Sequence, residues 1–366
     1  MKKILSILIS ASLLGCAGSP KGEAPALKEI GTMPAFEQGF EQGVSACYAA
    51  TFDNALYLTG GCNFPEKPAA EGGAKRYYKG IYRSAIGDTL QWEKVGELPA
   101  ASGYGANIQD GNRWFIVGGM NVDGASSSAI SIDLGDACKI ERLPDLPCCV
   151  DNTAGAVACD RLYVTGGNAD GKASNRTFVL DLKNTDAGWQ ELPIMPSRGR
   201  VQPVCTANST ALFVWGGFSP ADGDSSAEVH TDGWCYSFAT GVWTPLPKSI
   251  AAGDEVTLSG GTMALLNDST IVAAGGVNRE IFTDAISGTY ALVDKSDYML
   301  QPSEWYRFNP NLLTYDIGKR EWSVADKNCV YARAGALLLS DNGYIIYIGG
   351  ELKPGIRTPQ IHRYKM

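Results

Sequence analysis

The chain has 366 residues, of which 45% are hydrophobic, 10% aromatic and 19% charged. This apolar content excludes a disordered chain, and the lack of a collagen or heptad period excludes a fibrous one. The longest apolar run, residues 4–14, is shorter than the ~20 residues of a membrane-spanning helix. The net charge is −8, whereas a nucleic-acid-binding protein needs a basic surface, so we expect no nucleic-acid partner.

The N-terminus has the pattern of an export signal. Lys2 and Lys3 precede the apolar run, which predicts a signal peptide over residues 1–15. The stretch Leu13-Leu14-Gly15-Cys16 resembles the bacterial lipoprotein box, in which the cysteine is lipidated; an ordinary signal peptide is the alternative. We therefore expect a lipid on Cys16, a tether over residues 16–26, and an exported lipoprotein held on a bacterial membrane, in the periplasm or at the cell surface.

Histidine and cysteine usage limits the possible cofactors. The sequence has only two histidines, His230 and His362, which excludes a three-histidine zinc site. Nine cysteines remain besides Cys16, an odd number without a CxxC pair. We expect most of them to be small buried residues in strands, with one or two bridges. We expect neither a metal nor another cofactor.

A glycine pair closes an apolar run six times along the chain. Successive pairs are 48 to 74 residues apart, and a period near 50 with one pair per unit is typical of kelch propellers. Each run is short and rich in β-branched and aromatic residues, which predicts a buried strand. The pairs are Gly60-Gly61, Gly118-Gly119, Gly166-Gly167, Gly216-Gly217, Gly275-Gly276 and Gly349-Gly350.

A second pattern ends each unit: a predicted strand, which in most copies runs into a proline. Five copies follow glycine pairs, whereas the sixth, residues 27–34, lies at the start of the chain. Only 16 residues follow Gly350, enough for one more strand. We therefore expect an all-β, six-bladed kelch-type propeller over residues 27–366, a single domain whose ring closes when the N-terminal strand completes the last blade. An open array of six units would leave both ends unpaired.

The loops after the glycine pairs are the expected place for function, because variable loops on a rigid scaffold carry binding residues. Two are long: residues 62–78, and residues 277–305, where the apolar spacing suggests a short helix over the mouth of the channel. In the last unit Glu351 directly follows the glycine pair, and the turn at Pro354-Gly355 is expected to bring Arg357 back toward it.

The segment Glu351-Leu352-Lys353-Pro354-Gly355-Ile356-Arg357-Thr358 resembles the catalytic loop of the N-acetylneuraminate mutarotase (epimerase) family, in cyclically permuted form. Gly60-Gly61-Cys62-Asn63-Phe64-Pro65 and the segment from Gly276 to Phe282 are also similar. The resemblance implies interconversion of the α and β anomers of sialic acid by Glu351 and Arg357. The residues that we expect to bind the sugar are Arg200, Arg333, Asn63, Asn278, Tyr104 and Lys353.

Two other classes of function fit a kelch fold. One is a propeller that binds carbohydrate or protein without catalysis. The other is a copper radical oxidase, which needs two histidines and two tyrosines as ligands. His230 is expected in a loop and His362 in a strand, so we do not expect them to converge.

Overall fold

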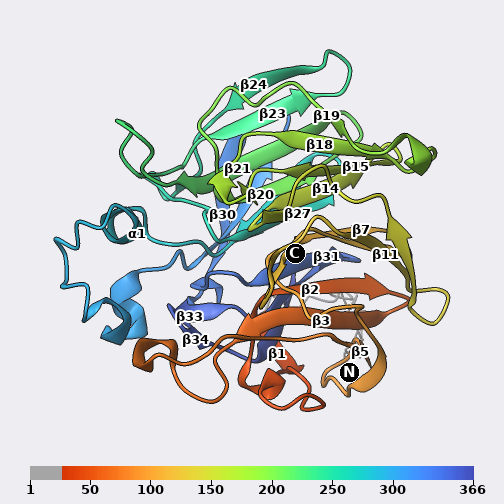
Figure 1. Cartoon of the computed structure of the whole chain (residues 1–366), viewed down its shortest axis with the longest axis horizontal. Helices are drawn as coiled ribbons and strands as arrows, with labels where there is room; N and C mark the ends of the chain where they lie inside the picture. Colours follow the sequence, from red (N-terminus) through yellow and green to blue (C-terminus); the bar gives the residue numbers. More distant parts are fainter. Residues whose placement is uncertain (1–26) are drawn as a thin grey trace, which may run out of the picture.

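The computed structural model describes residues 27–366, so the predicted signal peptide, Cys16 and the tether lie outside the described residues. The described chain is almost entirely strand and loop, with one α-helix, α1 (Arg279–Ile286), within the predicted 277–305 loop (Figure 1). No helix in residues 27–366 is both long and apolar enough to cross a bilayer.

Six antiparallel sheets follow one another along the chain, each with four strands in its main path. The first three fall within the first three predicted units. Sheet one has β2 (Ser45–Phe52), β3 (Ala55–Asn63), β5 (Gly80–Ala85) and β6 (Glu93–Glu97), with β4 (Arg76–Tyr77) beside β3. Sheet two has β7 (Ala106–Asp110), β8 (Arg113–Val117), β11 (Ala129–Asp133) and β12 (Lys139–Leu143). Sheet three has β14 (Ala154–Ala158), β15 (Arg161–Thr165), β18 (Thr177–Asp181) and β19 (Gln190–Glu191).

The other three sheets repeat this order. Sheet four has β20 (Val201–Ala207), β21 (Ala211–Ser219), β23 (Gly233–Ser237) and β24 (Val242–Leu246), with β22 (Glu228–Val229) beside β21. Sheet five has β27 (Thr262–Asn267), β28 (Thr270–Ala274), β29 (Asn311–Asp316) and β30 (Glu321–Lys327). Sheet six has β31 (Leu337–Asp341), β32 (Tyr344–Ile348), β35 (Gln360–Lys365) and β1 (Leu27–Thr32).

Short elements lie in the loops within and between the sheets. Two-stranded pairs are β9 (Met120–Asn121) with β10 (Gly124–Ala125), β25 (Ile250–Ala251) with β26 (Asp254–Glu255), and β33 (Glu351–Lys353) with β34 (Ile356–Arg357). A three-stranded sheet joins β13 (Val150–Asp151), β16 (Asn168–Ala169) and β17 (Lys172–Ala173). The 3₁₀ turns are η1 (Phe40–Gln42), η2 (Ala69–Glu71), η3 (Thr185–Ala187), η4 (Tyr298–Leu300), η5 (Ser303–Tyr306) and η6 (Cys329–Tyr331).

The expected pairing of the two ends of the chain is present. Strand β1 runs antiparallel to β35, with Leu27 opposite Tyr364 and Thr32 opposite Gln360. Ile30 of β1 is 1% exposed and packs in the core with residues of sheets one and six. The N-terminal strand therefore covers the β35 edge, which would otherwise present unpaired backbone groups.

Backbone hydrogen bonds form a cycle at the starts of the first strands. Six residues with left-handed φ, one per sheet, each donate to the carbonyl of the next residue in the cycle, at 2.7 to 3.2 Å. The first strands of neighbouring sheets, including β2 and β31, also contact one another. In order of donation the residues are Ala46, Gly335, Gly260, Gln202, Asn152 and Tyr104, whose N–H donates back to Ala46.

Close packing explains the glycine pair before the last hairpin. Gly350 has a φ of +94°, and a Cβ there would lie 2.7 Å from the Cβ of Ala336. Only glycine combines that φ with so little space. Strand β32 ends at Ile348, just before the pair, and the chain continues into the hairpin that begins at Glu351.

The expectation of one or two disulfides is wrong for the described residues. All nine cysteines of residues 27–366 are unbridged, and five of them are buried. Only three of them, Cys47, Cys62 and Cys205, are buried residues in strands, so the expectation of buried strand positions for most of the cysteines is also wrong.

Candidate active site

The β33–β34 hairpin places Glu351 and Arg357 opposite each other in register. The turn at Pro354-Gly355, where Gly355 has a φ of +84°, reverses the chain. The backbone of Glu351 is held by two hydrogen bonds to Ala334, at 2.7 and 3.0 Å. Across the hairpin, the Glu351 Oε1 atom pairs with Nη2 of Arg357. The expected convergence of these two side chains is therefore present.

The Arg357 guanidinium is nearly enclosed, with 3% of the side chain exposed. Its Nε donates to Ser45 Oγ at 3.2 Å, and its guanidinium carbon lies 4.8 Å from the ring centroid of Phe64. Its Nη1 is buried and has no hydrogen-bond partner among the described residues. Arg357 is thus fixed by Glu351, Ser45 and Phe64, in an arrangement that suits a planar cation.

At Glu351, burial affects the pKa of the carboxyl group more than the neighbouring charges do. Loss of solvent raises the pKa of its carboxyl group above the ordinary value of 4.5, although Arg357, Lys75 and Ser45 act to lower it. About a fifth of the side chain, 22%, remains exposed. A carboxyl group whose pKa is raised by burial, and which still reaches solvent, holds a proton more readily than an exposed glutamate and can exchange it with a ligand.

Glu351 lines a cavity of about 330 Å³. This volume lies within the range of roughly 300–1,000 Å³ that is typical of small-molecule sites. Figure 1 shows α1 and the β33–β34 hairpin on the same side of the molecule. The lining is mainly aromatic and apolar with a few polar groups, and includes Ser45, Tyr104, Gln202, Phe282, Tyr290 and Tyr298.

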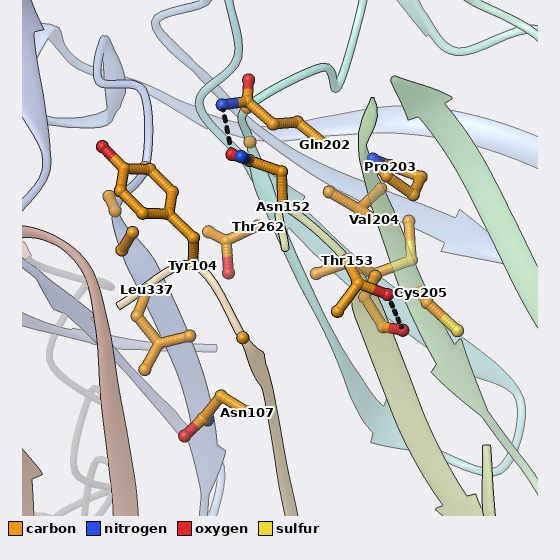
Figure 2. Close-up of a pocket in the computed structure, with 18 of the residues that line it drawn as sticks. Tyr104, Asn107, Asn152, Thr153, Gln202, Pro203, Val204, Cys205, Thr262 and Leu337 are labelled. Carbon is orange, nitrogen blue, oxygen red and sulfur yellow. Dashed lines mark hydrogen bonds between the residues drawn. The ribbon is translucent and has the colours of Figure 1, made fainter. Parts of the chain in front are cut away.

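A second cavity, of about 160 Å³, lies among the first strands of the sheets. Tyr104, Gln202 and Gly335 line both cavities, so the two meet at the cycle of left-handed residues. Figure 2 shows the amides of Gln202 and Asn152 in contact, with the Tyr104 ring across from them. The Nε2 of Gln202 donates to Oδ1 of Asn152 at 3.0 Å.

Three predicted sugar-binding residues are bonded inside the protein and line neither cavity. Arg200 is 1% exposed and pairs with Asp232 at 2.7 Å. Arg333 donates to the carbonyls of Gly349 at 2.9 Å and Gln360 at 3.3 Å. Asn63 donates to the carbonyls of Gly39 and Gly43 and accepts from the Tyr78 hydroxyl. The structure gives all three side chains contacts that hold loops and strands together.

The other three predicted binding residues differ in their contacts. Asn278 caps α1, because its side chain accepts from the Ile281 N–H at 3.1 Å. Lys353 donates to the Gln301 carbonyl at 2.7 Å and so ties the hairpin to the segment after α1. Tyr104 itself lines the cavity with Glu351.

The sequence analysis missed Ser45, Gln202 and Lys75. A signal for Gln202 exists: it lies fourteen residues before Gly216, as Ala46, Tyr104, Asn152 and Gly335 lie fourteen residues before the first glycine of their own pairs. Counting back fourteen residues from each pair would have identified five of the six residues of the hydrogen-bond cycle, since Gly260 lies fifteen residues before Gly275. Ser45 and Lys75 carry no comparable pattern, since only the folded loops bring them to the site.

The all-β fold built from glycine-pair units is consistent with a kelch β-propeller. Its paired carboxylate and guanidinium lie beside a cavity of small-molecule size. A model of the family described as "N-acetylneuraminate epimerase" matches residues 143–366, more than half of the chain, including Glu351 and Arg357. The chain belongs to this family.

Individual relatives agree with this assignment. The chain is 29% identical over 241 residues to the N-acetylneuraminate epimerase of Salmonella typhi, covering 64% of this chain and 61% of that protein. It is 26% identical over 238 residues to a kelch domain-containing protein of Vibrio cholerae serotype O1, covering 62% of this chain and 65% of that protein. The matches thus span less than two thirds of the length of these relatives.

Proposed function

We propose that the protein is a mutarotase that interconverts the α and β anomers of N-acetylneuraminate. The observation that carries this proposal is the Glu351–Arg357 pair at a cavity of monosaccharide scale, in a chain of the epimerase family. The reaction needs a group that moves a proton between two oxygens, and a site that holds a sugar acid while its ring opens.

Glu351 is the proposed proton carrier. Its carboxylate takes the proton of the hydroxyl on C2, the anomeric carbon. The bond between C2 and the ring oxygen then breaks, its electron pair goes to the ring oxygen, and C2 becomes a ketone. Because both oxygens are attached to C2, the proton that Glu351 accepts can pass to the ring oxygen. Rotation about the C2–C3 bond and the reverse steps give the other anomer.

The surroundings of Glu351 support this role. Burial raises its pKa above the ordinary value, which brings the pKa of the carboxyl group closer to neutral pH than that of an exposed glutamate, as general catalysis favours. Arg357, fixed by Ser45 and Phe64, holds the carboxylate in place on the opposite strand of the hairpin. The aromatic residues beside the cavity, Tyr290, Tyr298 and Phe282, offer apolar faces to a sugar ring.

We also propose that the six sheets are the blades of a closed six-bladed propeller. The cycle of six backbone hydrogen bonds supports closure, as does the pairing of β1 with β35. Export and lipidation at Cys16 remain our proposals for the segment outside the described residues, and they would place the reaction outside the cytoplasm.

The test follows the anomeric NMR signals of N-acetylneuraminate freshly released in the α form. The wild type should speed equilibration, and Glu351→Gln should lower this acceleration roughly 10²- to 10⁴-fold while the fold stays intact. Arg357→Ala should also be slower. Equal acceleration by Glu351→Gln and the wild type would refute the proposed role of Glu351. Sugar binding without acceleration by the wild type would indicate a carbohydrate-binding propeller instead.

A further inference from the structure

Lys75 places a second cation at the rim of the proposed active site. It lies at the end of the loop between β3 and β4, and its Nζ donates to the hydroxyl of Tyr104 at 3.3 Å. The ammonium is also 4.9 Å from the ring centroid of Tyr104 and 5.9 Å from that of Phe64. Since Tyr104 lines the cavity with Glu351, and Phe64 also contacts Arg357, Lys75 stands beside the same site.

The other cations of the predicted site already have charged or backbone partners inside the protein, although Nη1 of Arg357 has no partner in the described part of the chain. Arg357 pairs with Glu351, Arg200 pairs with Asp232, and Lys353 donates to the Gln301 carbonyl. No ion pair within residues 27–366 includes Lys75, and its side chain is exposed. An ammonium carries three donors, of which Tyr104 receives one, so the others are available to an anion.

The Tyr104 hydroxyl adds a second donor. It accepts from Lys75 Nζ and from Cys62 Sγ, both at 3.3 Å, which leaves its own proton for a ligand. Burial raises the pKa of Tyr104 well above its ordinary value, so the hydroxyl keeps that proton at neutral pH. An ammonium next to a hydroxyl donor is a suitable arrangement for a carboxylate.

We propose that Lys75, with the Tyr104 hydroxyl, binds the carboxylate of the sugar acid, and this inference rests on the proposed function. In a 2-keto sugar acid the carboxylate is attached directly to the anomeric carbon. A carboxylate held at Lys75 therefore fixes C2 and its two oxygens relative to Glu351. Lys75 is a specificity-determining residue in this scheme, because it selects acids over neutral sugars, while Glu351 moves the proton.

The test compares N-acetylneuraminate with its neutral C1 amide, both as substrates and as ligands in calorimetric titrations. The wild type should prefer the acid, and Lys75→Met should weaken binding of the acid roughly 10- to 100-fold, with little effect on the amide. Lys75→Arg should restore part of the preference. Lys67→Met, an exposed lysine of the same loop without an ion pair, is the control and should behave like the wild type.

The outcomes separate this inference from the proposed function. If Lys75→Met changes acid and amide equally, or changes neither, Lys75 does not bind the carboxylate, whether or not the enzyme is active. A wild type that does not distinguish acid from amide overturns the inference in the same way. If the wild type binds the acid through Lys75 but does not speed mutarotation, the proposed function fails and the carboxylate site stands.

Discussion

Glu351 and Arg357 face each other across a two-stranded hairpin, in register and joined by an ion pair. The six-residue spacing and the Pro354-Gly355 turn set this relationship locally. Ser45 of β2 and Phe64, in the loop after β3, contact the guanidinium as well. The pair therefore lies where the C-terminal part of the chain packs against the N-terminal part, and residues from both parts hold the Arg357 guanidinium.

The pH profile should reflect the raised pKa of Glu351. Because the active base is the ionised carboxylate, kcat/KM should fall as the pH drops through that pKa. The fall should be centred above 4.5, the ordinary value for glutamate, since burial raises the pKa in the folded protein. Stopped-flow or NMR rates between pH 4 and pH 8 check this. A midpoint at or below 4.5 would contradict the assignment.

Removing Arg357, the ion-pair partner of Glu351, should shift the pH profile of kcat/KM. Arg357 is the largest of the influences that lower the pKa of Glu351, so Arg357→Ala should shift the acidic fall of kcat/KM to higher pH. Arg363→Ala, which removes an arginine of strand β35, serves as the control and should leave the midpoint unchanged. An unshifted midpoint in Arg357→Ala would show that the two side chains do not interact in solution.

Gly43→Ala should destabilise the fold strongly. Gly43 has a φ of +93°, and a Cβ there would lie 2.2 Å from the carbonyl carbon of Thr358, next to Arg357. The matched control is Gly343→Ala, at a φ of +79° with open space around the position. The left-handed backbone costs roughly 1–3 kcal/mol at both positions, and the clash with Thr358 adds to this cost only at Gly43. Gly43→Ala should therefore lower Tm more than Gly343→Ala does. Similar Tm values would show that Thr358 and Gly43 are not in close contact.

Truncation tests the contribution of β1. A chain that starts at residue 35 loses β1 together with Ile30 and Met33, which are 1% and 3% exposed. Burial of each such side chain contributes roughly 1.5–3 kcal/mol, so a large drop in the free energy of unfolding is expected relative to a chain that starts at residue 27. The exposed β35 edge should also promote aggregation. Equal urea midpoints for the two chains would mean that β1 does not stabilise sheet six.

Much of the architecture can be predicted because glycine pairs and apolar runs are local signals. Four of the six glycine pairs directly follow a buried strand, whereas Gly60-Gly61 and Gly216-Gly217 lie inside β3 and β21. The position of residues 27–34 predicted the pairing with the C-terminal strand. The hairpin with Glu351 and Arg357 was predictable for the same reason: spacing and turn residues determine it. The helix that begins after Asn278 was also expected within its loop.

Contacts between distant segments were not predictable. The partner of Arg200 is Asp232, thirty-two residues later, and nothing in the spacing indicates that this cation is bonded internally. The positions of Ser45 and Lys75 depend on how sheets one and six meet. The balance at Glu351 between burial and the charge of Arg357 also required the folded surroundings, because both effects act at once and in opposite directions.

The most direct measurement is a crystal structure with N-acetylneuraminate bound. The sugar should lie in the cavity lined by Glu351 and Tyr104, with the hydroxyl and ring oxygens of C2 within hydrogen-bonding distance of the Glu351 carboxylate. A sugar bound away from that cavity, or one whose anomeric carbon points away from Glu351, would contradict this prediction.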